Sequence, residues 1–551
     1  MTASVLIILA TLASPAPTAS TMAGCAQKVP HYRAGHLIAM VCPDQAAALG
    51  LTIIDLSDDW TPLQFQPDET GSAPEYRGRF IALANEDQEA IGGRSDRHLD
   101  LYGIFPTLRV LGARLKEAER YRCHEAIESE SLSALDKLLR EERTADGRAR
   151  IKTDRQLRRS LETQVARRKL DSLDELAELN VYYRRRVARL RAREQKTAAF
   201  KAAQAHLVCD GYLSQRGVDG VFNWRTTNAL RVYQRRHFLV PTTHLDASTR
   251  TTMTHDPRES DVISALRVLR ARVGDATGIL EDGTAALSTS FVAGRLLDLS
   301  PLIHPRGHAA LPGAASDLLG NATNEVSEAL GWTTHQSILQ FIERHQGANG
   351  EVALEVAVEL SAPPDYHSTH MELEVVLDPG DVSRAKYKPK SAKRPALIVY
   401  ARHGEQRVAM VRWPTTVGGW QDKRLKSGWV KKCYMGSDFG DFVWRDLYIA
   451  PRWLPPDNTP DKDIVKRNEK GRWALDRKLF GPSFRSAYGL AMLIHHKVST
   501  HKETTNYVDR GVRTHGTGNI PSLDRSDRHG CPRLLGAHAN RLAAFLIRHR
   551  R

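Results

Sequence analysis

The sequence predicts a multidomain α+β protein with a charged α-helical N-terminal region, a small three-helix module and a mostly-β C-terminal domain. Three observations support this fold class. The chain has 551 residues, enough for about three to four domains of roughly 150 residues each. Residues 108–198 contain almost no Gly or Pro and carry apolar residues at helical spacing. After residue 350, apolar and polar residues alternate, which is typical of strands.

The composition is that of ordinary globular domains. Hydrophobic residues make up 41% and charged residues 26% of the chain, which excludes wholesale disorder, a collagen-like repeat and a coiled-coil rod. The length is sufficient to bury several cores without metal or disulfide support. Lys and Arg (79) outnumber Asp and Glu (64), so the formal net charge is +15. This excess favours an anionic partner, and nucleic acid, lipid and cell wall all remain open at this point.

Residues 1–24 have the features of a signal peptide. The apolar run at residues 5–12 is shorter than the about 20 residues that span a bilayer, but it has the length of a signal-peptide hydrophobic region. Small residues follow at 16–20, as a cleavage site requires. Export would place the protein in the periplasm or cell envelope. The alternative is an apolar N-terminal strand of a cytoplasmic protein.

The sequence Met-Ala-Gly-Cys at residues 22–25 resembles a lipobox, in which Cys25 would become a lipidated first residue that tethers the protein to a membrane. No two of the six cysteines form a CxxC metal or redox pair. In an oxidising compartment, one or two disulfides are expected, and the sequence does not determine their pairing. The cysteines available for them are Cys42, Cys123, Cys209 and Cys433.

The first part of the chain carries no pattern that indicates chemistry. Residues 25–107 alternate short apolar runs with turn signals and are assigned to an N-terminal domain. Residues 108–198 form the charged helical region, which we interpret as long solvated helices. A nucleic-acid-binding arm is the alternative, but it would lack interleaved aromatic residues, so no nucleic acid partner is expected.

Residues 199–245 carry a more specific pattern. After one amphipathic helix comes a tight Asp-Gly turn, and a second helix follows in which Leu230 and Tyr233 face a core. The run Val-Asp-Gly-Val-Phe at residues 218–222, with its spacing to these positions, resembles the small helical peptidoglycan-binding domain of cell-wall enzymes. The resemblance implies peptidoglycan as a partner. A generic three-helix packing unit is the alternative.

Two regions complete the expected architecture. Residues 246–349 are predicted to form a helical connecting domain, and residues 350–551 a mostly-β domain. Alternating apolar residues at 352–360 and 371–377 predict strands, and a closing helix is expected at residues 536–550.

A candidate catalytic constellation lies near the C-terminus. A nucleophilic cysteine needs a base or positive neighbours to reach its thiolate form. Cys531 has His515 available as a base and Arg533 at close range. Gly530 lets the backbone approach a reacting carbonyl carbon, and the N–H groups of Gly530 and Cys531 can face an oxyanion. Arg533 is suited to bind a substrate carboxylate through two hydrogen bonds.

This arrangement resembles the catalytic motif of L,D-transpeptidases, which have a β-rich catalytic fold. The family pattern is His-Gly-Thr, a spacer, and then Ser/Thr-x-Gly-Cys-x-Arg. Here Cys531 follows His515 by 16 positions, which is the family's spacing. The resemblance implies that Cys531 is the nucleophile and that His515 is the general base, oriented by the carbonyl group of Gly516 or by Thr517. It implies no metal and no organic cofactor.

The resemblance also assigns roles around the cysteine. His529 and Gly530 would border the oxyanion hole. Two upstream segments resemble the family as well, namely Ala-Pro-Arg-Trp-Leu-Pro-Pro at residues 450–456 and the Tyr-Gly-Leu that begins at residue 488. The implied substrate-binding residues are Arg533, which would bind the donor stem peptide, and Thr517, Trp453 and Tyr488. The chain departs from the family pattern at Arg528, where Ser or Thr is usual, and at Pro532, where an aliphatic residue is usual.

The expected function is therefore that of an exported peptidoglycan L,D-transpeptidase. Cys531 would form a thioester with a donor stem and release D-Ala, and a side-chain amine of a neighbouring stem would complete a 3→3 cross-link. Three alternatives stay open. Water as acceptor would make the protein an L,D-carboxypeptidase. A protein with an inert cysteine would be a non-catalytic peptidoglycan-binding scaffold. A zinc peptidase would fit the His-rich C-terminal part, although no HExxH pattern is present.

Overall fold

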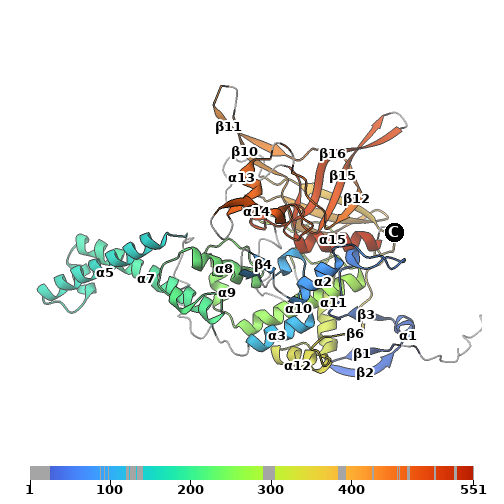
Figure 1. Ribbon diagram of the computed structural model, residues 1–551, viewed down its shortest axis with the longest axis horizontal. Helices are drawn as coiled ribbons and strands as arrows, with labels where there is room; N and C mark the ends of the chain where they lie inside the picture. The colour runs from blue at the N-terminus through green and yellow to red at the C-terminus, as the bar shows by residue number, and fades with distance from the viewer. Residues whose placement is uncertain are drawn as a thin grey trace, which may run out of the picture.

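The computed structural model describes most of the chain, and Figure 1 shows its elements. The described residues are 25, 27–86, 89–91, 94–96, 99–118, 123, 132, 141–288, 305–381, 393–424, 427–455, 457, 459–467, 472–501, 504–525 and 530–549. The predicted signal peptide and the candidate site residue His529 lie outside them. Within these ranges, no helix combines the length and the apolar character needed to cross a membrane.

An N-terminal body is built around a four-stranded sheet in the order β2-β1-β6-β3. Its strands are β1 (Val29–Arg33), β2 (His36–Val41), β3 (Leu51–Asp55) and β6 (Glu355–Glu359). β6 runs parallel to β1 and antiparallel to β3, so that Ala357 lies opposite both His31 and Ile53. The predicted domain boundary at residue 350 is therefore wrong. The alternating pattern revealed the strand, but its partners lie in a distant segment that a local pattern does not identify.

Helices that come before residue 119 and after residue 256 in the sequence pack with this sheet into one hydrophobic core. They are α2 (Arg77–Glu86), α3 (Leu108–Ala118), α10 (Pro257–Thr277), α11 (Leu318–Leu330) and α12 (His335–His345). Two predicted regions are corrected as a result. Leu108, Leu111 and Leu115 of α3 belong to this core, although they were assigned to the charged region. Residues 246–349 contribute to the same core and do not form a separate connecting domain.

A helical arm projects from the body on one side (Figure 1). It consists of α5 (Thr144–Arg167), α6 (Leu173–Leu179) and the first part of α7 (Val181–Cys209). Leu161 and Leu176 belong to a small core that joins these helices, while Arg158 pairs with Glu194 across the surface at 2.6 Å. This segment matches the long solvated helices that the apolar spacing predicts.

The end of α7 enters a three-helix module with α8 (Trp224–Arg236) and α9 (Ala247–Met253). Leu207 and Phe222 are fully buried in its core, and so are the two residues that the sequence places there, Leu230 and Tyr233. The module lies between the arm and the N-terminal body (Figure 1).

The C-terminal domain is mostly β. A three-stranded sheet (β7-β8-β9), a four-stranded sheet (β12-β15-β16-β17) and the last helix, α15 (Gly536–His549), contribute to its core. The strands are β7 (Glu372–Asp378), β8 (Ala396–His403), β9 (Gln406–Pro414), β12 (Phe442–Ile449), β15 (Ala491–His501), β16 (Thr504–Thr517) and β17 (Arg533–Leu535). The hairpin of β10 (Gly418–Arg424) and β11 (Val430–Gly436) and the β15–β16 hairpin project from this domain (Figure 1).

Short elements complete the fold. They are α1 (Pro43–Ala48), η1 (Leu63–Phe65), β4 (Glu89–Ile91), β5 (Arg94–Asp96), η2 (Asp100–Tyr102), η3 (Gln215–Gly217), α13 (Asp461–Ile464), β13 (Val465–Arg467), β14 (Trp473–Leu475), η5 (Arg477–Leu479) and α14 (Pro521–Arg525). Together the elements form the mixed multidomain α+β architecture that the sequence predicts.

Two disulfides join cysteines in the N-terminal half. Cys25 is bonded to Cys42, and Cys123 to Cys209. The first bond corrects the predicted lipidation, because the sulfur of Cys25 that would carry the lipid is already bonded to another sulfur. The side chain of Cys433, a further candidate for a disulfide, is not among those described.

Candidate active site

The candidate catalytic residues meet where two strands of the C-terminal sheet run side by side. β16 and β17 are parallel, with His515 opposite Arg533, and the N–H group of His515 donates to the carbonyl oxygen of Pro532 at 3.2 Å. Cys531 immediately precedes this pairing. The sheet register therefore brings together the two motifs that the sequence separates by 16 positions.

The thiol of Cys531 lies beside β16. It is partly exposed, it is a free cysteine, and its Sγ lies 3.7 Å from the carbonyl oxygen of Gly511, to which the thiol can donate. Gly511 belongs to the same strand as His515, four residues earlier. The thiol is thus accessible, and in this resting arrangement it points toward a backbone carbonyl group.

His515 is held as a neutral imidazole. Its side chain is only 3% exposed, and Nδ1 lies 2.6 Å from the carbonyl oxygen of Gly516. A carbonyl oxygen only accepts, so Nδ1 carries the hydrogen and Nε2 keeps its lone pair. Burial, with the charge of Arg533 as a second cause, lowers the pKa of His515 to about 3. The imidazole is therefore neutral near pH 7, with Nε2 unprotonated.

Tyr488 packs against the candidate histidine, His515. Its ring meets the imidazole of His515 edge-on, with 5.1 Å between ring centroids. The pKa of Tyr488 is raised by burial first and by the nearby Cys531 second. The next residue, Gly489, has a φ of +66°, and a Cβ there would lie 2.9 Å from the carbonyl carbon of Gly516. Only glycine allows this close approach, which places Tyr488 at the site.

Hydroxyl groups from two upstream segments hold the backbone around the cysteine. Thr416 donates through Oγ1 to the carbonyl oxygen of Cys531 at 3.2 Å, and Thr415 donates to that of Arg533 at 2.9 Å. Ser437, just after β11, donates to the carbonyl oxygen of Gly530. Gly530 itself has a φ of +105°. These bonds set the orientation of the peptide groups that would have to face an oxyanion.

Two arginines place positive charge near the thiol and the imidazole. Arg533, predicted from the sequence, is partly buried and donates to Ser522 Oγ at 3.4 Å. Arg513 was not predicted. Its pKa is raised by its hydrogen bonds to Asp509 first, and Cys531 is a further cause. Arg513 and His515 are two residues apart on β16, so alternation along a strand was the signal that could have identified Arg513.

The remaining predicted residues are less closely associated with the thiol. Thr517 is 2% exposed, and its Oγ1 accepts from the N–H group of Asn519 at 3.0 Å, so its hydroxyl group caps a turn. The Gly516 carbonyl, and not Thr517, is the group seen to orient the imidazole. Trp453 stacks on Phe480 with 5.9 Å between centroids, and no contact described for it reaches Cys531 or His515. Among the described residues, no group of three or more His, Cys, Asp or Glu is placed to hold a metal ion.

The three-helix module contains two buried glutamines that organise its turns. Gln204 accepts from the N–H group of Gly220 at 2.9 Å and donates to the carbonyl oxygen of Val221 at 3.0 Å. Gln234 donates to the carbonyl oxygen of His244 at 2.9 Å. Asn223 caps α8 by accepting from backbone N–H groups. The Asp-Gly turn of the sequence motif is therefore built into the core of the module through side-chain hydrogen bonds.

Comparison with known proteins identifies this module. Residues 196–253 match the sequence model of a family described as "Putative peptidoglycan binding domain". No curated protein and no solved structure matches the chain. The match includes all of residues 199–245, for which the sequence motif indicated the same family. It supports the conclusion that the chain is a peptidoglycan-associated protein with a cell-wall-associated location.

Proposed function

We propose that the protein is an exported peptidoglycan L,D-transpeptidase in which Cys531 is the nucleophile. The observation that carries the proposal is the geometry of His515. Its Nδ1–H is bound to the Gly516 carbonyl group, its Nε2 lone pair is available, and its strand is paired with the segment that bears Cys531. A neutral imidazole on a strand that pairs with the segment following the cysteine supports the role of base, which requires Nε2 to come within hydrogen-bond reach of the thiol.

The reaction has two acyl-transfer steps. His515 Nε2 takes the proton of the Cys531 thiol, and the thiolate attacks the carbonyl carbon that joins the third stem residue to the terminal D-Ala. The tetrahedral intermediate collapses, the C–N bond breaks, and D-Ala leaves with the proton from His515. A side-chain amine of a second stem then attacks the thioester, loses a proton to His515 and restores the thiol.

Positive charge at the site supports an acidic substrate. Arg533 and Arg513 lie on neighbouring strands near the thiol, and guanidinium groups bind carboxylates through paired hydrogen bonds. Stem peptides carry such carboxylates. The peptidoglycan-binding module supports delivery of this substrate, because it would hold the enzyme on the same polymer.

The disulfides support export. Cys25–Cys42 and Cys123–Cys209 are of the kind that forms and persists outside the cytosol. A polymer located outside the cytoplasmic membrane is accessible only to an exported enzyme.

Mass spectrometry of the intact protein after incubation with a carbapenem tests the proposal, since the family resemblance implies acylation of the cysteine. We expect one covalent adduct on the wild type and none on Cys531→Ser. Incubation with tetrapeptide stems should release D-Ala from the wild type alone. Analysis of the second product separates a 3→3 cross-link from the tripeptide that a carboxypeptidase would form.

A non-catalytic scaffold is the second candidate, and one observation favours it. The thiol of Cys531 lies within reach of the Gly511 carbonyl oxygen, and no described hydrogen bond links it to His515. A wild-type protein that sediments with sacculi, forms no carbapenem adduct and reacts with iodoacetamide no faster than a free thiol would establish this alternative.

A further inference from the structure

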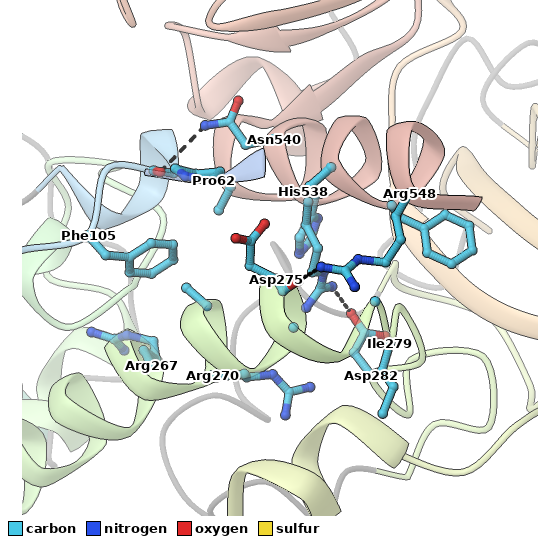
Figure 2. A pocket seen from close by; sticks show the side chains of 18 of the residues that line it. Pro62, Phe105, Arg267, Arg270, Asp275, Ile279, Asp282, His538, Asn540 and Arg548 are labelled. Carbon is cyan, nitrogen blue, oxygen red and sulfur yellow. Dashed lines mark hydrogen bonds and ion pairs between the residues drawn. The ribbon is translucent and has the colours of Figure 1, made fainter. Parts of the chain in front are cut away.

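The positive charge of the protein is concentrated in the helical arm. Residues 144–198 contain 16 Lys or Arg and 8 Asp or Glu, so this segment carries more than half of the formal net charge of +15. Arginines of the interior are paired instead. Figure 2 shows the cavity that α10 and α15 line, where Arg541 pairs with Asp282. Arg270, at the same cavity, pairs with Asp317 at 3.0 Å. An anionic partner is therefore expected at the arm.

The far end of the arm is where α5 ends and α7 begins (Figure 1). α5 starts beside the three-helix module, where the N–H group of Glu142 donates to the carbonyl oxygen of Phe222 at 2.9 Å. At the other end, Arg168 follows α5 and donates through Nη2 to Tyr183 Oη of α7 at 3.3 Å. The first turns of α7 are therefore as far from the module as the arm allows.

Three arginines lie on the outer face of these first turns. Val187 and Leu190 of α7 are buried in the small core of the arm. Arg185 and Arg189 are four positions apart, so they share a face of the helix, and Arg184 adjoins them. All three side chains are exposed, and within the described part of the chain no ion pair involves them.

Neighbouring charges of the arm are already engaged. Arg191 pairs with Asp174 at 2.6 Å, and Arg193 pairs with Asp154 at 2.7 Å. Glu178 of α6 is exposed, and its single negative charge reduces the charge of the three arginines without cancelling it. The outer face at the end of the arm thus keeps a net positive charge that is available to a partner.

Apolar side chains are exposed beside these arginines. Leu179 is 47%, Val181 54% and Tyr182 60% exposed, and Tyr182 Oη accepts from Arg186 Nη1 at 2.8 Å. A polyanion that offers only charge would gain nothing from Leu179 and Val181, whereas a lipid surface would remove both from water. We refer to this set as the distal patch, which consists of Leu179, Val181, Tyr182, Arg184, Arg185 and Arg189.

We propose that the distal patch docks on an anionic membrane surface. Its arginines would bind lipid phosphates, and its apolar side chains would enter the boundary between headgroups and acyl chains. The ring of Tyr182 suits this boundary, because it is apolar along its body and polar at its hydroxyl group. The 29 residues of α7 span about 44 Å between the patch and the peptidoglycan-binding module. The arm would therefore act as a spacer between the membrane and that module.

Flotation with lipid vesicles tests the proposal. The protein without residues 1–24 is used, because the apolar run of the predicted signal peptide would itself bind lipid, and all described residues follow that segment. Saturable binding is expected to vesicles of phosphatidylglycerol and phosphatidylethanolamine in about 0.1 M NaCl. Binding should fall at least about tenfold in about 1 M NaCl, where the screening length drops from about 10 Å to about 3 Å. Equal binding to phosphatidylcholine vesicles would overturn the proposal.

A charge variant shows whether the patch is the part that binds. Arg185→Gln with Arg189→Gln should weaken binding about ten- to thirtyfold, since each cation near an anionic surface contributes about fivefold. Lys201→Gln with Arg216→Gln removes the same charge from exposed positions and is the matched control. Lys201 lies on the same helix, about 24 Å from Arg185 along its axis. If the control pair weakens binding as much, the overall charge attracts the lipid and the proposal is wrong.

A variant of unchanged charge distinguishes a membrane from an anionic polymer. Leu179→Ser with Tyr182→Ser should weaken vesicle binding at least about tenfold and leave binding to inorganic polyphosphate unchanged. Tyr182→Trp should strengthen vesicle binding, because Trp favours the interface. Circular dichroism verifies that the arm stays helical. Vesicle binding that is insensitive to both changes would mean that the patch responds to charge alone, as for a nucleic acid, and would overturn the proposal. These readouts do not depend on whether Cys531 is catalytic.

Discussion

Asp509 holds the guanidinium group of Arg513 with both carboxylate oxygens, each accepting a hydrogen bond of 2.7 Å. Asp509 Oδ1 also accepts from the N–H group of Gly511 at 2.8 Å, and the carbonyl oxygen of Gly511 lies beside the Cys531 thiol. The ion pair thus fixes both a positive charge and a segment of backbone next to the proposed nucleophile.

The first prediction concerns this charge. Arg513→Gln should slow alkylation of Cys531 by iodoacetamide at pH 7 by about three- to tenfold, because a nearby cation favours the thiolate. Arg513→Lys should restore most of the rate. Arg510→Gln, at an exposed position of the same strand, is the control. Equal rates for the wild type and Arg513→Gln would show that the charge does not act on the thiol.

The second prediction concerns pH. The pKa of His515 is lowered to about 3, chiefly by burial, so the imidazole is neutral throughout the range from pH 5 to 8. The rate of carbapenem acylation should therefore show no loss centred near pH 6.5, the ordinary value for histidine. Arg533→Gln removes the nearby positive charge, which is the second cause of the low pKa of His515. The pH at which the acylation rate begins to fall on the acid side should therefore rise only slightly. A wild-type inflection near pH 6.5 would contradict the buried, neutral imidazole.

The third prediction concerns the turn at the nucleophile. Gly530→Ala places a side chain at a φ of +105° and a Cβ 3.2 Å from the carbonyl oxygen of Gly436. The backbone strain should cost about 1–2 kcal/mol, and displacement of the peptide group should reduce carbapenem acylation at least about tenfold. Gly404→Ala has a φ of +60° but open space around it, so it should leave acylation unchanged. Thermal unfolding of both variants should be measured beside the acylation rates, so that a loss of stability can be separated from a loss of reactivity.

Local patterns predicted the residues of the candidate site but not their surroundings. The motif spacing identified His515 and Cys531 as candidates, and the parallel pairing of β16 with β17 puts His515 opposite Arg533, two residues after Cys531. Ser437 and Thr416 were missed because they reach the cysteine segment from connecting segments that are distant in the sequence, through contacts that only the folded chain creates. The role of Arg513 likewise depends on its ion pair with Asp509.

The predicted domain boundary at residue 350 was wrong for the same physical reason. A strand is recognised by its own alternation, whereas its neighbours in the sheet are chosen by packing over the whole chain. β6 therefore looked like the start of the C-terminal domain although it completes the N-terminal sheet. The three-helix module was predictable because its contacts are local, as in the bond from Gly220 to Gln204.

The fourth prediction tests that module. Gln204→Leu leaves the buried N–H group of Gly220 without its acceptor, at a cost of about 1–3 kcal/mol, while the carbonyl oxygen of Val221 keeps the N–H group of Asn223. The module should lose stability, and sedimentation with purified sacculi should fall. Carbapenem acylation should be unchanged, because the C-terminal domain has its own core. Gln215→Leu, exposed in the same module, is the control. If the module of the Gln204→Leu protein is unfolded and the protein still sediments with sacculi as well as the wild type, another surface binds the wall.

The last prediction concerns the carboxyl group of Asp275, which joins α10 to the segment around Leu63. Burial raises its pKa from 3.8 to about 6, although Arg548 and Arg272 act in the opposite direction. The folded state therefore binds this proton more tightly than the unfolded state. The stabilising contribution is complete below about pH 4 and is lost as the pH rises through 6.

Asp275→Asn removes this dependence. The free energy of unfolding of the variant, relative to the wild type, should rise between pH 4 and 6 by about 1–3 kcal/mol and then remain constant. Chemical unfolding of both proteins across this range measures the difference, and its change with pH is informative even if the substitution alters absolute stability. A difference that stays flat, or that falls with rising pH, would mean that the ionised carboxylate is favoured in the folded protein and that Asp275 forms a structural ion pair with Arg548 or Arg272.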